Sequence, residues 1–136
     1  MRKTAAILLG LICTFTMVSC NLTPQVAVLT IKNSSGEEVN DITFSYEHAS
    51  KNQMQTVKID RLSDNESKTL NLELTSPSSA IGAGSVVVPG KIEYYINSTK
   101  FNMDNGDGYI DLSSSDGGFK TIITIYRDGW KVTREK

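Results

Sequence analysis

The sequence predicts an all-β protein, and three observations support this prediction. From residue 26 onward, runs rich in Val, Ile, Thr, Tyr and Phe are separated every eight to fifteen residues by clusters of Gly, Asn, Asp and Ser. Several runs alternate apolar and polar residues, as strands with one buried face do. No window of a dozen residues has the spacing of a capped amphipathic helix. We therefore expect an antiparallel β-sandwich of immunoglobulin-like or fibronectin-like general shape, or alternatively a small β-barrel.

Eight strands are predicted after residue 25, each bounded by residues that favour turns. Seven or eight strands in one domain of this length are typical of a sandwich. In chain order the predicted strands are 26–32, 42–47, 55–61, 68–75, 91–97, 109–113, 119–127 and 131–134.

Alternation is clearest in the second, fourth and fifth of these runs. In each of them, three apolar residues at a spacing of two point to one face and polar residues point to the other. The apolar members are Ile42, Phe44 and Tyr46, then Leu70, Leu72 and Leu74, then Ile92, Tyr94 and Ile96.

Turn-forming residues separate the strands. Residues 33–36 (Asn-Ser-Ser-Gly) and 127–130 (Arg-Asp-Gly-Trp) are typical of hairpin connections, the second because Asp and Gly tolerate positive φ. The polar residues 63–67 indicate another turn. We therefore expect consecutive strands to pair as antiparallel neighbours.

The longest predicted connection spans residues 76–90 and contains an apolar triplet. One interpretation is a short edge strand at Val86, Val87 and Val88 that Pro89 ends. The other is a mobile binding loop, because long connections in compact domains are often functional. In that case the three valines, if exposed, form a partner surface.

The first twenty residues resemble the export signal of a bacterial lipoprotein. Arg2 and Lys3 precede a nearly uncharged run at 4–18, which is shorter than the about 20 apolar residues that span a bilayer. Residues 17–20 (Met-Val-Ser-Cys) resemble the lipobox that ends such signals. Ordinary signal cleavage with secretion, and an uncleaved anchor, are the alternatives.

The resemblance implies a processed, membrane-anchored protein. A signal helix at 1–19 is removed, the sulfur of Cys20 receives a diacylglycerol, and a further acyl chain such as palmitate modifies the new amino terminus. Residues 20–25 then form a lipidated tether, followed by one domain at 26–136. Because Asn21 stands where a retention signal has Asp, the anchor is expected in the outer membrane of a host with two membranes. In a host with one membrane it is expected on the outer face of the cytoplasmic membrane.

Charge and cysteine content exclude several classes of function. Without residues 1–19 the chain has twelve basic and fifteen acidic side chains, so its formal charge is −3, and the charges are dispersed. This composition argues against a nucleic-acid-binding surface. Removal of Cys13 and acylation of Cys20 leave no thiol for a disulfide.

The residues that enzymes most often use are scarce in this chain. His48 is the single histidine, and we expect it to be a polar residue at the end of a strand. A zinc site or a Ser-His or Cys-His arrangement therefore has too few ligands or bases, and we expect no enzymatic activity. The strand carboxylates are predicted to lie on solvated faces; they are Glu47, Asp60, Glu73, Glu93 and Asp111.

One segment, residues 105–111, resembles the centre of the calcium loops of EF-hand and dockerin modules. The first and last ligand positions of such a loop fall on Met103 and Ser114, which removes two carboxylates. A hairpin turn is the favoured interpretation, and no cofactor is expected. The alternative is a weak calcium site formed by Asp104, Asp107 and Asp111.

Aromatic residues offer a candidate binding surface. Tyr94 and Tyr95 are adjacent in a predicted strand, so one points to the core and the other to solvent. An exposed Tyr95 near Trp130 could form a ligand platform. The alternative is that Trp130 closes one end of the core.

These features together predict a membrane-anchored envelope lipoprotein that acts as a non-enzymatic binding or structural module. Its expected partners are the bilayer, through acylated Cys20, and an envelope or extracellular protein or glycan. One alternative is a protective inhibitor or immunity-type lipoprotein against a toxin, phage factor or wall-degrading enzyme, which would insert the 76–90 connection into its target. Another is a calcium-dependent adhesion module.

Overall fold

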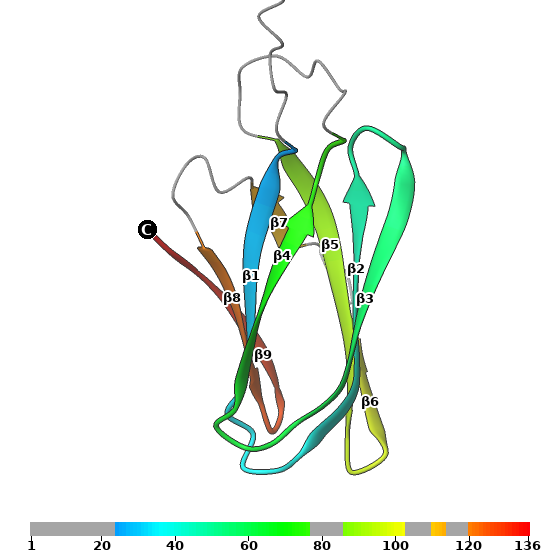
Figure 1. Ribbon diagram of the computed structural model, residues 1–136. Helices are drawn as coiled ribbons and strands as arrows, with labels where there is room; N and C mark the ends of the chain where they lie inside the picture. The colour runs from blue at the N-terminus through cyan, green and yellow to red at the C-terminus, as the bar shows by residue number, and fades with distance from the viewer. Residues whose placement is uncertain (1–23, 77–85, 103–109, 114–119) are drawn as a thin grey trace, which may run out of the picture.

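The computed structural model describes residues 24–76, 86–102, 110–113 and 120–136. In these residues the chain is a β-sandwich in which two sheets of mostly antiparallel strands pack face to face without closing into a barrel (Figure 1). The predicted all-β sandwich is confirmed, and the small-barrel alternative is not.

Four strands form one sheet, in the order β4-β1-β8-β9, and five strands form the other. In the second sheet the order is β3-β2-β5-β6, and β7 also pairs with β5. The strands are β1 (Val26–Asn33), β2 (Val39–His48), β3 (Gln53–Leu62), β4 (Ser67–Glu73), β5 (Val87–Ile96), β6 (Thr99–Asn102), β7 (Ile110–Ser113), β8 (Lys120–Tyr126) and β9 (Gly129–Glu135).

The expectation that consecutive strands pair is correct for three hairpins and wrong for the other connections, including those from β1 to β2, from β3 to β4 and from β4 to β5, which join different sheets. β2 pairs with β3, β5 with β6, and β8 with β9, all antiparallel. β1 instead lies antiparallel to β4 and parallel to β8. Residues 33–36 therefore cross from one sheet to the other and do not form a hairpin, and residues 63–66 cross back.

A β-bulge interrupts the pairing of β2 with β5. The register shifts between Asn40 and Thr43, and Asp41 has a φ of 49° there. An extra residue in one strand bends it and increases its twist. The bulge lies near the start of β2, which begins at Val39.

Residues 87–90 belong to β5 and not to a long connection. Val86 and Val88 are buried in the core, whereas Val87 is 57% exposed. Pro89 lies within the strand, and the pairing of β5 with β2 extends only as far as Gly90. Proline has no N–H to donate, which explains why β2 pairing does not continue past this point.

The core lies between the two sheets, and its packing requires glycine at position 90. A Cβ atom added at Gly90 would lie 2.5 Å from Cζ of Phe44, so only glycine allows this ring to lie against the strand. The largest fully buried side chains are Tyr94, Phe44, Leu29, Ile31, Ile42, Leu62, Leu72, Leu74, Ile92, Leu112, Ile123 and Ile125.

The two ends of the sandwich differ in what connects the strands. We call the end formed by residues 33–38, 63–66, 97–98 and 127–128 the turn end; it is the lower end in Figure 1. We call the opposite end, where Gln25 enters β1, the tether end. It includes the described connecting residues 24–25, 49–52, 74–76 and 86.

Candidate functional site

Asn33 is the centre of the turn end and is fully buried. Its side-chain amide donates to the carbonyl oxygens of Glu37 (2.7 Å) and Leu62 (2.9 Å). Its Oδ1 accepts from the backbone N–H (3.0 Å) and the hydroxyl (2.7 Å) of Ser35. One side chain therefore joins the end of β1, the 33–38 turn and the end of β3, which stabilises the crossing between sheets.

Carboxylates complete the hydrogen bonding of the neighbouring turns. Asp64 accepts from the backbone N–H of Gly36 (2.9 Å) and from the side-chain amide of Asn65 (2.8 Å). Glu66 accepts from the backbone N–H of Ser63 (2.8 Å). Gly36 and Asn65 both have positive φ, which glycine and asparagine adopt at low cost. The two sheet-crossing turns are thus held to each other.

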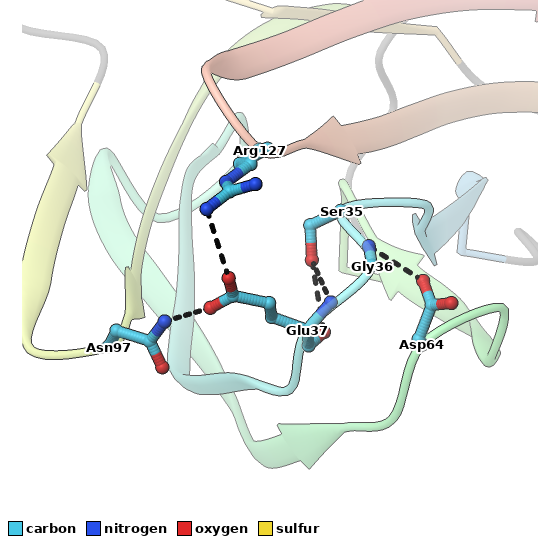
Figure 2. Close-up of polar contacts among 6 residues, drawn as sticks. All are labelled: Ser35, Gly36, Glu37, Asp64, Asn97 and Arg127. Atoms are coloured by element: carbon cyan, nitrogen blue, oxygen red, sulfur yellow. Dashed lines mark hydrogen bonds and ion pairs between the residues drawn. The ribbon is translucent and has the colours of Figure 1, made fainter.

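Glu37 links the 33–38 turn to two hairpin tips (Figure 2). Its carboxylate accepts a hydrogen bond from the side-chain amide of Asn97, and its Oε1 lies 3.7 Å from a guanidinium nitrogen of Arg127. These residues line a cleft of about 160 Å³. The remaining lining residues are Ile96, Thr99 and Phe101.

An aromatic pair supports this cleft from the core side. The rings of Tyr94 and Phe101 stack with centroids 5.1 Å apart. The Tyr94 hydroxyl donates to the carbonyl oxygen of Gly129 (3.1 Å). Burial, with a smaller contribution from the Asp128 carboxylate, raises the pKa of Tyr94 to about 12, so the phenol stays a donor over the neutral range. The β8–β9 tip is thereby anchored to β5.

The turn end is acidic. Its four turns contain five carboxylates and a single basic residue, Arg127, whose side chain is 81% exposed. The five carboxylates are Glu37, Glu38, Asp64, Glu66 and Asp128. Residues far apart in the sequence thus form one negatively charged surface that the dispersed charges of the sequence do not reveal.

A larger hollow lies on the outer face of the five-stranded sheet, beside the bulge at Asp41. Its volume is about 370 Å³, within the usual range for small-molecule sites. It is open and lined mainly by polar side chains. The lining residues are Asp41, Ile42, Thr43, Lys58, Ile59, Asp60, Glu93 and Tyr95.

The cleft and the hollow both suit recognition of a polar partner. Each offers carboxylate, amide or hydroxyl oxygens, a basic side chain and one aromatic residue. Within the described ranges, no group of three His, Cys, Asp or Glu residues is arranged to hold a metal ion. The chemistry available here is hydrogen bonding and ion pairing at an open surface.

The structure separates Tyr95 from Trp130. Tyr95 lines the hollow on the outer face of β5, whereas Tyr94 is fully buried, as the alternation predicts. Trp130 is partly buried against the core in β9, which belongs to the other sheet. The predicted platform is therefore not formed, and Trp130 packs on the core instead.

The other predicted site residues are described only in part. Cys20, Asp104 and Asp107 lie outside the described residues. Asp111 lies in β7, where its carboxylate is 3.8 Å from Arg134 Nη2, and the same Arg134 nitrogen donates to the Asp111 carbonyl (3.2 Å). Of the 76–90 connection, residues 77–85 lie outside the described residues.

The burial of His48 was not predicted from the sequence. It ends β2 as predicted, but its side chain is only 2% exposed. Neither ring nitrogen has a hydrogen-bond partner among the described residues, and Nε2 lies 3.6 Å from Oε1 of Glu73. The sequence does contain a signal for this burial, because residue 48 continues the spacing of two that places Ile42, Phe44 and Tyr46 on the buried face of the strand.

Glu73 affects a second residue in this region. Burial, and to a smaller extent the Glu73 carboxylate, raises the pKa of Tyr46. The ring of Tyr46 also stacks on Phe44, with centroids 6.3 Å apart. Glu73 therefore lies close to both Tyr46 and His48 near the tether end.

In the part of the chain that the structure describes, no helix is long and apolar enough to cross a membrane. No protein-family model matches the sequence, and comparison with curated proteins gives no significant match.

Proposed function

We propose that the protein is a membrane-anchored envelope lipoprotein that acts as a non-enzymatic binding or structural module and presents its turn end to a polar partner. The observation that carries the proposal is the direction of the chain. The lipobox-like residues 17–20 precede Gln25 at the tether end, and the turns that form the cleft lie at the opposite end. An acyl chain on Cys20 would therefore point the turn end away from the membrane.

The construction of the turn end supports a recognition role. Its 33–38 turn is held to the ends of β1 and β3 by the buried hydrogen bonds of Asn33, so little conformational entropy is lost when a partner binds. Arg127 is exposed and makes one long contact with Glu37, which leaves most of its donors facing outward. An envelope or extracellular protein or glycan with both donors and acceptors fits such a surface.

The lipid anchor is tested by intact mass and membrane partitioning of the cell-expressed protein beside a Cys20→Ala variant. We expect the wild type to lose residues 1–19, carry a diacylglycerol on Cys20 and remain in the membrane fraction. The variant should lack the lipid mass and become soluble. Two unacylated, soluble proteins would contradict the anchor.

The recognition surface is tested by photo-crosslinking in intact cells. A photoreactive amino acid replaces Glu38, which is exposed at the turn end, or, as the matched control, Asn71, which is exposed in the middle of β4. We expect a discrete adduct from position 38 and none from position 71. The same adduct from both positions, or from neither, would contradict a partner at the turn end.

A further inference from the structure

Two large hydrophobic side chains are exposed near the tether end. Met54 is 58% exposed and Val87 is 57% exposed, the two highest values for large hydrophobic residues in the described ranges. Met54 pairs with Glu47 near the start of β3, and Val87 is the first residue of β5. Both follow connections at the same end of the sandwich (Figure 1).

The tether cannot hold the domain far from a membrane. Gln25 is fixed to the fold, because its N–H donates to Thr75 Oγ1 (2.9 Å), its carbonyl accepts from Leu74 N–H (2.7 Å) and its Oε1 accepts from Val86 N–H (3.0 Å). Cys20 precedes it by five residues, a span of at most about 17 Å.

The sandwich is longer than this tether. β5 has ten residues and extends about 33 Å at the usual strand rise. A domain of that length cannot turn over freely on a tether of half the length. If Cys20 is acylated, the tether end therefore stays within about 17 Å of the bilayer surface.

Charge favours the same orientation. The turn end contains five carboxylates and one arginine, so it is repelled by anionic lipid headgroups. The described connections of the tether end contain one charged residue, the exposed Lys51 at the tip of the β2–β3 hairpin, and two carboxylates, Glu47 and Glu73, lie in the adjoining strand ends. The tether end is therefore less acidic than the turn end. Lys51 lies three residues before exposed Met54, and a basic residue near an exposed apolar side chain is typical of a membrane-surface contact.

We propose that the tether end is a second membrane-contact surface, in which Met54 and Val87 enter the interfacial region of the bilayer and Lys51 faces anionic headgroups. This inference rests on the proposed lipid anchor and names the surface that the anchor presses against the membrane. It gives the domain a fixed upright orientation with the cleft of Glu37 and Arg127 facing away.

The test uses single labelled cysteines in the acylated, processed protein. Because Cys20 carries the lipid and Cys13 is removed with the signal, a new cysteine is the one free thiol. Met54→Cys and Val87→Cys report on the tether end, and Glu38→Cys, exposed at the turn end, is the matched control. Each is labelled with a polarity-sensitive fluorophore and incorporated into phosphatidylethanolamine–phosphatidylglycerol vesicles.

We expect the emission at positions 54 and 87 to rise roughly two-fold on vesicles and to be quenched by a lipid-borne quencher, as for groups buried at the headgroup boundary. The label at position 38 should stay unquenched. A Lys51→Glu change should reduce the quenching at position 54, because it replaces attraction to anionic headgroups by repulsion.

The possible failures are distinguishable. Acylated, vesicle-bound protein whose three labels are equally accessible to water would overturn the membrane-contact surface and leave the anchor intact. Protein without the lipid mass would overturn the anchor itself. Burial of the labels at 54 and 87 without vesicles, increasing with protein concentration, would assign the surface to a second copy of the chain and overturn the inference.

Discussion

The two sheets are joined differently at the two ends of the sandwich. At the turn end, the buried side chain of Asn33 makes four hydrogen bonds that connect three segments. At the tether end the sheets are joined by separate hydrogen bonds from different residues. Ala49 N–H donates to the Leu74 carbonyl (2.8 Å), Ser76 N–H to Ser50 Oγ (3.0 Å), and Val86 N–H to Gln25 Oε1 (3.0 Å). There the buried ring of His48 lacks hydrogen-bond partners among the described residues.

This difference indicates that the turn end is the more rigid of the two. Fully satisfied buried polar networks stabilise one arrangement, whereas an unpartnered buried polar group lowers stability. Exposed Met54 and Val87 add to the contrast, because the turn end is covered by charged and amide side chains. We therefore expect substitutions at the two ends to differ in both size and sign.

The largest effect is expected for Asn33→Ala. The change removes all four hydrogen bonds of the buried Asn33 side chain, and of its former partners the Glu37 carbonyl and the Ser35 hydroxyl keep the bond to each other (3.0 Å). It should lower the free energy of unfolding by about 3 kcal/mol or more. Chemical denaturation measures this loss.

The matched variant at the tether end is Thr75→Val, which removes one acceptor, from Gln25 N–H, and should cost about 1 kcal/mol. Equal losses for the two variants would contradict the idea that the turn end is the more strongly connected one.

The second effect has the opposite sign. His48→Leu replaces an unpartnered buried imidazole by an apolar side chain of similar size, and it should raise the free energy of unfolding by about 1 to 2 kcal/mol near pH 8. Thermal unfolding of the two proteins at that pH provides the measurement. The control variant is Glu73→Gln, which removes the charge of the carboxylate next to His48 and keeps the imidazole. A destabilised His48→Leu protein would mean that the 3.6 Å contact of Nε2 with Glu73 Oε1 outweighs the cost of burying the imidazole.

The third effect concerns the aromatic support of the cleft. Tyr94→Phe removes the hydrogen bond to the Gly129 carbonyl but keeps the stack with Phe101, so it should cost about 1 kcal/mol in denaturation experiments. An unchanged stability would show that the hydroxyl does not anchor the β8–β9 tip.

The same residue makes stability depend on pH under basic conditions. Because folding raises the pKa of Tyr94 from 10.0 to about 12, the folded state holds the phenolic proton more strongly than the unfolded state does. Its contribution to stability should be complete below pH 10 and should be lost as the pH rises to about 12. Thermal unfolding across this range should show a steeper fall in the wild type than in Tyr94→Phe.

The smallest effect on stability is expected for Arg127→Ala. The Arg127 side chain is 81% exposed and its ion pair with Glu37 is 3.7 Å long, so its removal should change the free energy of unfolding by less than about 0.5 kcal/mol. If Arg127 contributes to partner binding, Arg127→Ala should nevertheless abolish the photo-crosslinked adduct that forms at the turn end. A large loss of stability would assign Arg127 a structural role instead.

Much of the fold follows from local patterns in the sequence. Alternation at residues 42–46, 70–74 and 92–96 located three strands, and it also placed Tyr94 inside and Tyr95 outside. β6 was missed because its four residues, 99–102, have too few apolar positions to show a period. The start of β5 was placed too late because Pro89 and Gly90 are typical of connections.

The candidate site was much less predictable. The cleft joins Glu37, Asn97 and Arg127, which come from three turns; the first two residues are 60 positions apart in the sequence. The acidic surface of the turn end is formed by carboxylates from three of the four turns. Neither has a local sequence signal.

By itself, the sequence determined the all-β class, most strand positions and the resemblance of residues 1–20 to a lipoprotein signal, because alternation, turn chemistry and signal patterns depend on residues close together in the chain. The tertiary structure alone decided that residues 33–36 cross between sheets, that β1 lies parallel to β8, and that the turns gather into an acidic end opposite the tether. These features depend on which apolar faces pack together and on bonds such as that from Asn33 to Leu62, twenty-nine residues apart, which no local pattern encodes.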